Sequence, residues 1–268
     1  MYVHFLDPYR PRSSPIHSLD GRVKFLLTVA FILTASLTPV PAWPVYILLF
    51  AIILSVEILS GLGVGYVLKR ALLALPFVLA AFPVIFTYGK TSLFSFTLGP
   101  WNLTAHAEGL ARFASAVLKS WLSVQAAILL VACTPFPELL QAMRAVGIPR
   151  LLVGMFGMMW RYLFVLVDEA LRLLRARAAR SGQAEGGIGR SGGNLLWRAR
   201  VTGGMAGNLL LRGYERSDRI YVAMLSRGYD GEVRLLPLPP MSAVPWTILL
   251  AGLALLILLL AFGLLFWA

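Results

Sequence analysis

The stretch VPWTILLAGLALLILLLAFGLLFWA, residues Val244–Ala268, decides the class of fold. It contains no charged residue, and it exceeds the roughly 20 residues that a helix needs to cross the hydrocarbon core of a bilayer. The rest of the chain has the same character. Of its 268 residues 59% are hydrophobic and only 13% are charged, whereas a soluble domain carries about 25% charged residues. The sequence therefore predicts an all-α integral membrane protein.

Four further apolar windows bring the expected number of transmembrane helices to about five. They cover residues 23–37, 45–59, 71–88 and 105–133. Lys and Arg favour the cytoplasmic side of a membrane, and here they gather in residues 1–22, at Lys69 and Arg70, and in residues 134–240. The sequence thus predicts a cytoplasmic N-terminal segment (1–22), transmembrane helices 1–4 (23–133), a cytoplasmic helical segment (134–240) and a C-terminal transmembrane helix (241–268) that ends outside.

Several charged residues fall inside apolar stretches. Arg161 interrupts residues 151–167, which favours a helix lying against the membrane or other helices, because a central Arg costs roughly 2.5–3.5 kcal/mol on insertion. Arg112 and Lys119 indicate either a helix that begins outside the bilayer or a buried cation lining a pathway. Glu57 fits a solvated helix end better than a proton relay.

Two triplets in the basic segment have the form small residue, Arg, small residue: Ala179-Arg180-Ser181 and Ser226-Arg227-Gly228. They close two predicted helices, about 150–179 and 194–226. A Gly-rich linker (181–193), which we expect to be flexible, separates these helices. Local physics offers one explanation, since Arg near a helix C-terminus gains about 0.3–1 kcal/mol from the helix dipole. The duplication favours another, because small neighbours leave a guanidinium free to enter a groove and bind a carboxylate.

A group of methionines accompanies the triplets: Met143, Met155, Met158 and Met159. Packing in a core would explain them. Met is also favoured on surfaces that repack against a mobile partner. The group is therefore a tentative contact surface for a partner protein.

Catalytic and cofactor motifs are missing from the sequence. It contains no phosphate-binding loop and no H-E-x-x-H motif, its three His residues are far apart, and Cys133 is its single Cys. We therefore expect neither an enzyme nor a metal or cofactor site. The net charge of +12 fits the positive-inside bias of a membrane protein, and we expect no nucleic-acid partner. Nor do the windows show the polar residues or repeats of a self-sufficient carrier.

Three stretches carry a resemblance to a known family: SLDGRVKFLL (18–27), AVGIPRLLVGMFGMMWRYLFVLVDEALRLLRARAARS (145–181) and LLLRGYERSDRIYVAMLSRGYDG (209–231). The chain resembles the transmembrane T component of energy-coupling-factor (ECF) transporters, specifically the cobalt-type CbiQ branch. The resemblance covers nearly the whole chain. Both triplets depart slightly from the Ala-Arg-Gly form that is commonest in that family, but their small flanking residues are kept.

This resemblance implies a complex with two ABC-type ATPase subunits, a substrate-binding membrane subunit of CbiM type and possibly a small accessory membrane subunit, in the plasma membrane. It implies that residues 134–240 are coupling helices, that the two triplets insert into the ATPases, and that the ATPases bind ATP while another subunit binds metal. The expected function is ATP-driven uptake of cobalt ions. Nickel uptake and a membrane scaffold without transport are the alternatives.

Overall fold

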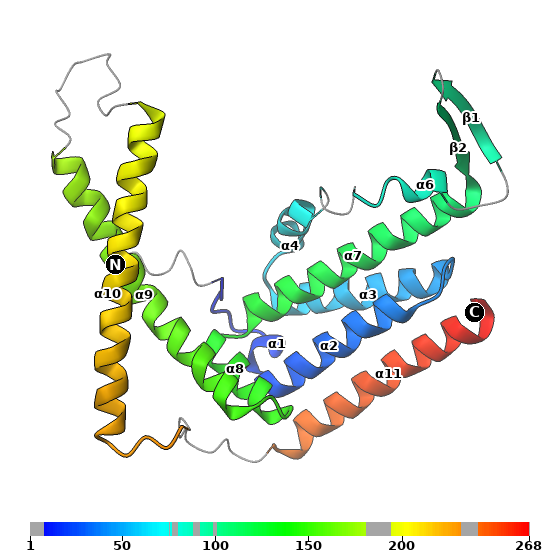
Figure 1. Cartoon of the computed structure of the whole chain (residues 1–268). Coiled ribbons are helices and arrows are strands. Elements are labelled where there is room, and N and C mark those ends of the chain that lie inside the picture. The colour runs from blue at the N-terminus through cyan, green and yellow to red at the C-terminus, as the bar shows by residue number, and fades with distance from the viewer. Residues whose placement is uncertain are drawn as a thin grey trace. The chain divides into compact units, whose positions relative to one another are not determined.

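The computed structural model describes residues 8–74, 76, 80–87, 92–98, 101–180, 194–231 and 241–267. The chain divides into two compact units, one formed by Met1–Val146 with Leu238–Ala268 and the other by Gly147–Pro237. Helices dominate the described residues of both units (Figure 1), which confirms the predicted all-α membrane class. The linker predicted for residues 181–193 lies outside the described residues.

The first unit contains most of the helices. Its elements are α1 (Pro15–Ser18), α2 (Gly21–Leu37), α3 (Trp43–Ser60), α4 (Val64–Ala71), the 3₁₀ turn η2 (Leu72–Ala74), α6 (Val84–Thr87), β1 (Ser92–Leu98), β2 (Trp101–His106), α7 (Ala107–Cys133), α8 (Phe136–Ala145) and α11 (Ala243–Trp267). Helices α2, α3, α7 and α11 lie side by side (Figure 1). Their apolar faces enclose one core, to which Phe31, Leu49, Leu122 and Leu256 contribute.

The ends of the apolar helices follow from local sequence. Asp20 caps α2 by accepting a hydrogen bond from the backbone N–H of Arg22 at 2.9 Å. Helix α3 ends at Gly61, whose φ of 67° is the left-handed conformation that terminates helices. These signals set the start of α2 and the end of α3.

Within the residues that the structure describes, four helices are long and apolar enough to cross a membrane: α3, α7, α11 and, in the second unit, α9 (Arg150–Arg180). Helix α2 has 17 residues and is shorter than these four. The window 71–88 differs from the continuous helix that we expected. Its described residues form the end of α4, η2 and α6, and Pro76 and Pro83 explain the interruption, since Pro lacks the N–H that helix bonding needs.

A two-stranded hairpin precedes α7 and adds β structure that the sequence reading did not expect. Strands β1 and β2 pair antiparallel, and Leu98 lies opposite Trp101. The hairpin occupies most of the connection between the apolar windows 71–88 and 105–133.

The half-buried side chain of Lys119 caps a helix of this unit. The Nζ atom of Lys119 donates to the carbonyl oxygens of Ser36 at 3.0 Å and Thr38 at 2.6 Å, at the C-terminal end of α2. Neither of the two explanations offered for Lys119 anticipated this role. Glu57 also differs from the expected solvated helix end, because it is only 2% exposed and its Oε1 has no hydrogen-bond partner in the described part of the chain.

Candidate functional site

The second unit consists of two long helices, α9 and α10 (Leu195–Leu225). They run antiparallel, because residues late in α9 meet residues early in α10. Arg177 near the end of α9 donates to the hydroxyl of Thr202 at 3.0 Å, whereas Tyr162 lies beside Arg216, with 5.9 Å between the guanidinium carbon and the ring centroid. The two helices thus form an antiparallel, hairpin-like pair.

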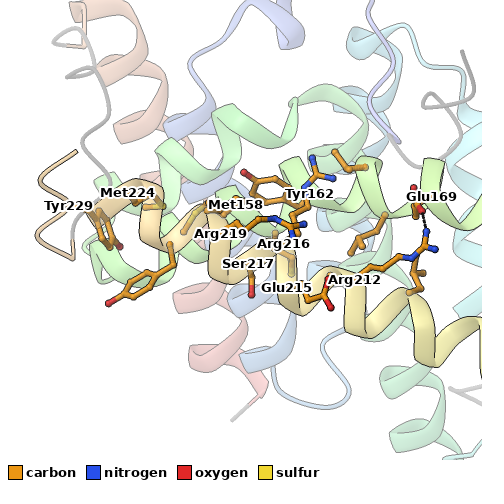
Figure 2. A pocket seen from close by; sticks show the side chains of 17 residues that line it. Met158, Tyr162, Glu169, Arg212, Glu215, Arg216, Ser217, Arg219, Met224 and Tyr229 are labelled. Carbon is orange, nitrogen blue, oxygen red and sulfur yellow. Dashed lines mark hydrogen bonds and ion pairs between the residues drawn. The ribbon is translucent and has the colours of Figure 1, made fainter. Parts of the chain in front are cut away.

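One ionic cluster joins the two helices near their middle. The Glu169 carboxylate lies 2.9 Å from Arg172 on its own helix and pairs with Arg212 on α10 (Figure 2). The arginines are more than half exposed, and such pairs contribute at most about 1 kcal/mol. The cluster therefore sets the register of the helices more than it stabilises the fold.

A groove of about 520 Å³ runs between α9 and α10. Figure 2 shows Tyr162 and Glu169 on α9 above Arg216 and Arg212 on α10, with Met158 and Met224 farther toward the left of the view. One end is apolar, with Met158, Met224 and Tyr229, while the other end carries the ionic cluster. A partner protein can bind such a groove through apolar contacts at one end, and the charges at the other end can orient it.

The second Arg triplet forms a Schellman cap at the end of α10. The backbone N–H of Tyr229 donates to Met224 at 3.1 Å, and that of Gly228 donates to Leu225 at 3.0 Å. These are the two bonds that define this cap, and they require the left-handed conformation that Gly228 adopts, with a φ of 78°. Arg227 thus sits at the turn of the chain, with an exposed side chain.

The first triplet is built differently. Ala179 and Arg180 are the last two residues of α9 and both are exposed, while Ser181 lies outside the described residues. The triplets are therefore similar in sequence but not shown to share one local conformation. In both, the described guanidinium group is exposed at the end of a long helix.

The antiparallel arrangement separates the two arginines. Arg180 lies at the end of the pair where α10 begins, and Arg227 lies at the end where α9 begins. At a rise of 1.5 Å per residue, a helix of this length puts roughly 40 Å between the two ends. The guanidinium groups of Arg180 and Arg227 therefore lie far apart, at opposite ends of the helix pair.

The structure brings only part of the methionine group together. Met158 and Met159 line the groove. Met155 is 54% exposed on α9 but does not line it, and Met143 belongs to α8 in the other unit. Residues that the sequence reading missed complete the groove: Tyr162, Arg212, Arg216, Met224 and Tyr229. Their helical spacing on α10 is the signal that could have revealed them.

No metal centre occurs in the described parts of the chain, where no three His, Cys, Asp or Glu side chains lie close enough to hold an ion. The groove offers two carboxylates, Glu169 and Glu215, among several arginines. The Glu169 carboxylate is already engaged by Arg172 and Arg212. This chemistry suits protein contact rather than ion binding.

Comparison with known proteins decides the family. The family described as CbiQ, cobalt transport protein, matches residues 12–238. The chain belongs to the CbiQ family. It is therefore a multi-pass membrane protein and the non-catalytic transmembrane T component of an ECF transporter, with a coupling role in such a complex. These findings confirm the predicted family and the non-catalytic role.

Relatives of this CbiQ-family chain come from bacteria and archaea. The energy-coupling factor transporter transmembrane protein EcfT of Thermosediminibacter oceani is 29% identical over 84% of this chain and 84% of its own length. The cobalt transport protein CbiQ of Salmonella typhimurium is 28% identical over 59% of this chain and 72% of its own length. A putative fused cobalt transport protein CbiMQ of Methanocorpusculum labreanum is 25% identical over 93% of this chain and 42% of its own length.

Proposed function

We propose that this chain couples two ABC-type ATPase subunits to a CbiM-type substrate-binding membrane subunit for ATP-driven uptake of cobalt ions. The observation that carries the proposal is the position of Arg180 and Arg227 at opposite ends of one antiparallel helix pair. Two exposed arginines at one end could serve only one ATPase. Two arginines that lie far apart can enter the grooves of two neighbouring subunits at the same time.

The same geometry supports a mechanism of force transfer. ATP binding draws the two ATPases together, and each carries one Arg tip with it. The helices touch at a few points, such as the Glu169–Arg212 pair, so they can pivot about that contact and change their crossing angle. The change in crossing angle then alters the surface on which the substrate-binding subunit docks. This change opens the path for the ion.

We assign the substrate-binding subunit to the apolar end of the groove and its surroundings. Met158 and Met159 line this end, and Met155 is exposed nearby on the same helix. Flexible thioether side chains suit a surface that must repack while the helices move. Met143, in the other unit, stays part of the proposed contact. The fused CbiMQ relative supports a partner of CbiM type.

Cobalt is proposed as the substrate because the CbiQ relatives are described as cobalt transport proteins. The ion itself is bound by the partner, and ATP is bound by the ATPases. Nickel is the second candidate, and uptake of radiolabelled cobalt and nickel by cells that express the complete complex separates the two. A membrane scaffold without transport would give uptake of neither ion.

The orientation is also a proposal. The Lys and Arg distribution puts the N-terminus and residues 134–240, including the linker 181–193, in the cytoplasm of a cell with this chain in its plasma membrane. A membrane-impermeant thiol reagent should label a Cys introduced at Gln183 only after the cells are opened. Labelling of intact cells would overturn this orientation.

The coupling role is tested by copurification of the ATPases with tagged variants. Arg180→Ala and Arg227→Ala should each weaken ATPase retention, and the double variant should lose it together with ion uptake, while membrane insertion persists. Arg175→Ala and Arg200→Ala, at exposed arginines within the same two helices, are the matched controls. Wild-type retention of ATPases by the double variant would refute the proposal.

A further inference from the structure

A second basic site lies in the first unit, where the N-terminal segment meets α4. The guanidinium carbon of Arg10 lies 3.9 Å from the ring centroid of Tyr66, and that of Arg70 lies 4.7 Å from the same centroid. One ring therefore holds two cations close together. We call Arg10, Tyr66 and Arg70 the arginine–tyrosine cluster.

The cluster is pre-formed by the backbone. The N–H of Arg10 donates to the carbonyl oxygen of Ala132 at 3.0 Å, near the end of α7, and His17 Nε2 lies 3.0 Å from the carbonyl oxygen of Arg10. Arg70 is held by α4, which packs against α7 and buries Val67 and Ala71. Segments distant in sequence thus meet to bring two guanidinium groups onto one ring.

The positive charge of the cluster is not balanced by acidic side chains. In the portion of the chain that the structure describes, no aspartate or glutamate pairs with Arg10 or Arg70. Both arginines are exposed, and the neighbouring Lys69 and Arg12 are exposed as well. Two like charges gathered on one ring repel each other, and a bound anion that contacts both relieves the repulsion. Guanidinium forks are well suited to the oxygens of a phosphate.

The surroundings of the cluster indicate where that phosphate comes from. Leu72 and Leu73 follow Arg70 directly and are 53% and 74% exposed. Helix α4 follows α3, a membrane span, after a short turn at Gly61 and Gly63. A cationic site beside exposed leucines at the end of a span is the arrangement that receives a lipid, with its headgroup on the arginines and its chains beside the leucines.

We propose that the arginine–tyrosine cluster binds the phosphate of an anionic phospholipid headgroup, and that Leu72 and Leu73 contact its acyl chains. Tyr66 acts as the platform that keeps the two guanidinium groups together. Its hydroxyl is buried without a hydrogen-bond partner in the described residues, so the ring rather than the hydroxyl performs this role. A bound lipid would fix the N-terminal segment to the membrane edge of α4 and α7.

The test uses the full chain purified in detergent and titrated with phosphatidylglycerol or with phosphatidylcholine of the same acyl chains, with binding read by native mass spectrometry. The wild type should prefer phosphatidylglycerol. Each basic residue at an anionic surface contributes about fivefold to binding, so Arg10→Gln with Arg70→Gln should lower phosphatidylglycerol affinity by roughly 30-fold. The charge-matched control, Arg175→Gln with Arg200→Gln, should change it less than twofold.

Substitutions of Tyr66 distinguish a lipid-binding site from a cation–aromatic stack that has only a structural role. Tyr66→Phe should keep the preference for phosphatidylglycerol, and Tyr66→Leu should lose most of it with both arginines still present. If the arginine double variant does not fold, the Tyr66 pair gives the same comparison. Unchanged phosphatidylglycerol binding by Tyr66→Leu or by the double variant would overturn the proposal.

Two further outcomes address the source of the phosphate. Millimolar inorganic phosphate or glycerol 3-phosphate should fail to displace phosphatidylglycerol, because neither soluble ion contacts Leu72 and Leu73. Displacement by either ion would refute the lipid assignment and leave a general anion site. Equal loss of binding in the control pair would show that net charge, rather than the cluster, attracts the lipid, and would also refute it.

Discussion

Lys24 and Cys133 are joined across the first unit by a hydrogen bond from the Lys24 Nζ to the Cys133 carbonyl oxygen at 3.1 Å. Lys24 is near the start of α2, and Cys133 ends α7. At the other end of the same two helices, Lys119 of α7 donates to the carbonyls that end α2. Each helix therefore supplies a lysine that caps its antiparallel neighbour, where bare carbonyls would be costly in a membrane.

This reciprocal capping predicts that Lys119→Met destabilises the first unit. The Ser36 and Thr38 carbonyls lose their donor, and the acceptor of the buried Thr38, left without a partner, costs about 1–3 kcal/mol. The melting temperature in detergent should fall. Lys69→Met, at an exposed lysine, is the control and should leave the melting temperature nearly unchanged. Equal melting temperatures for both variants would contradict the capping role.

Replacement of Gly228 should disturb the tip of α10 alone. Gly228→Ala forces a side chain into the left-handed region at a cost of about 1 kcal/mol, so the amide protons of Gly228 and Tyr229 should exchange faster. There is open space around the Gly228 Cα, so a steric clash would not explain the effect. Gly207→Ala lies in the helical interior of α10 with equal space and should slow exchange slightly. Slower exchange at Tyr229 in Gly228→Ala would disprove the cap.

The contact between α11 and α2 depends on Gly252. A Cβ atom at this position would lie 2.6 Å from Leu27 Cδ2, at the end of a side chain that has to shift, so Gly252→Ala should lower stability by about 1 kcal/mol through overpacking. Leu27→Ala introduced together with Gly252→Ala should restore part of the loss. Gly263→Ala in the same helix meets its nearest neighbour at 3.4 Å and should cost little. Thermal unfolding in detergent checks all three, and additive losses in the double variant would count against the predicted contact.

The Glu169–Arg212 pair should be weak but measurable. A double-mutant cycle of Glu169→Gln and Arg212→Gln on thermal stability should yield a coupling energy of about 0.2–1 kcal/mol, as expected for an exposed pair. The neighbouring carboxylate makes a suitable control, because Asp168→Asn combined with Arg212→Gln should be additive. A coupling energy of zero would mean that the Glu169–Arg212 pair adds nothing to stability, which would contradict this prediction.

Some features of the molecule could be predicted from the sequence, and others could not. The membrane class, the two Arg-rich helices and the family followed from apolar length, charge distribution and three short stretches. The interruption of the window 71–88 could have been predicted from Pro76 and Pro83. The caps formed by Lys24 and Lys119 could not, because each involves carbonyls 81 to 109 residues away along the chain.

The two Arg triplets were likewise predictable from the sequence only in part. The sequence by itself determined that Arg180 and Arg227 end two long helices, because composition and glycine positions act locally. Only the tertiary structure decided that these ends point apart, that Glu169 meets Arg212, and that Met158 and Met224 share a groove. The physical reason is that side-chain periodicity specifies which face of a helix packs, whereas the direction and register of its partner depend on contacts between residues far apart in the chain.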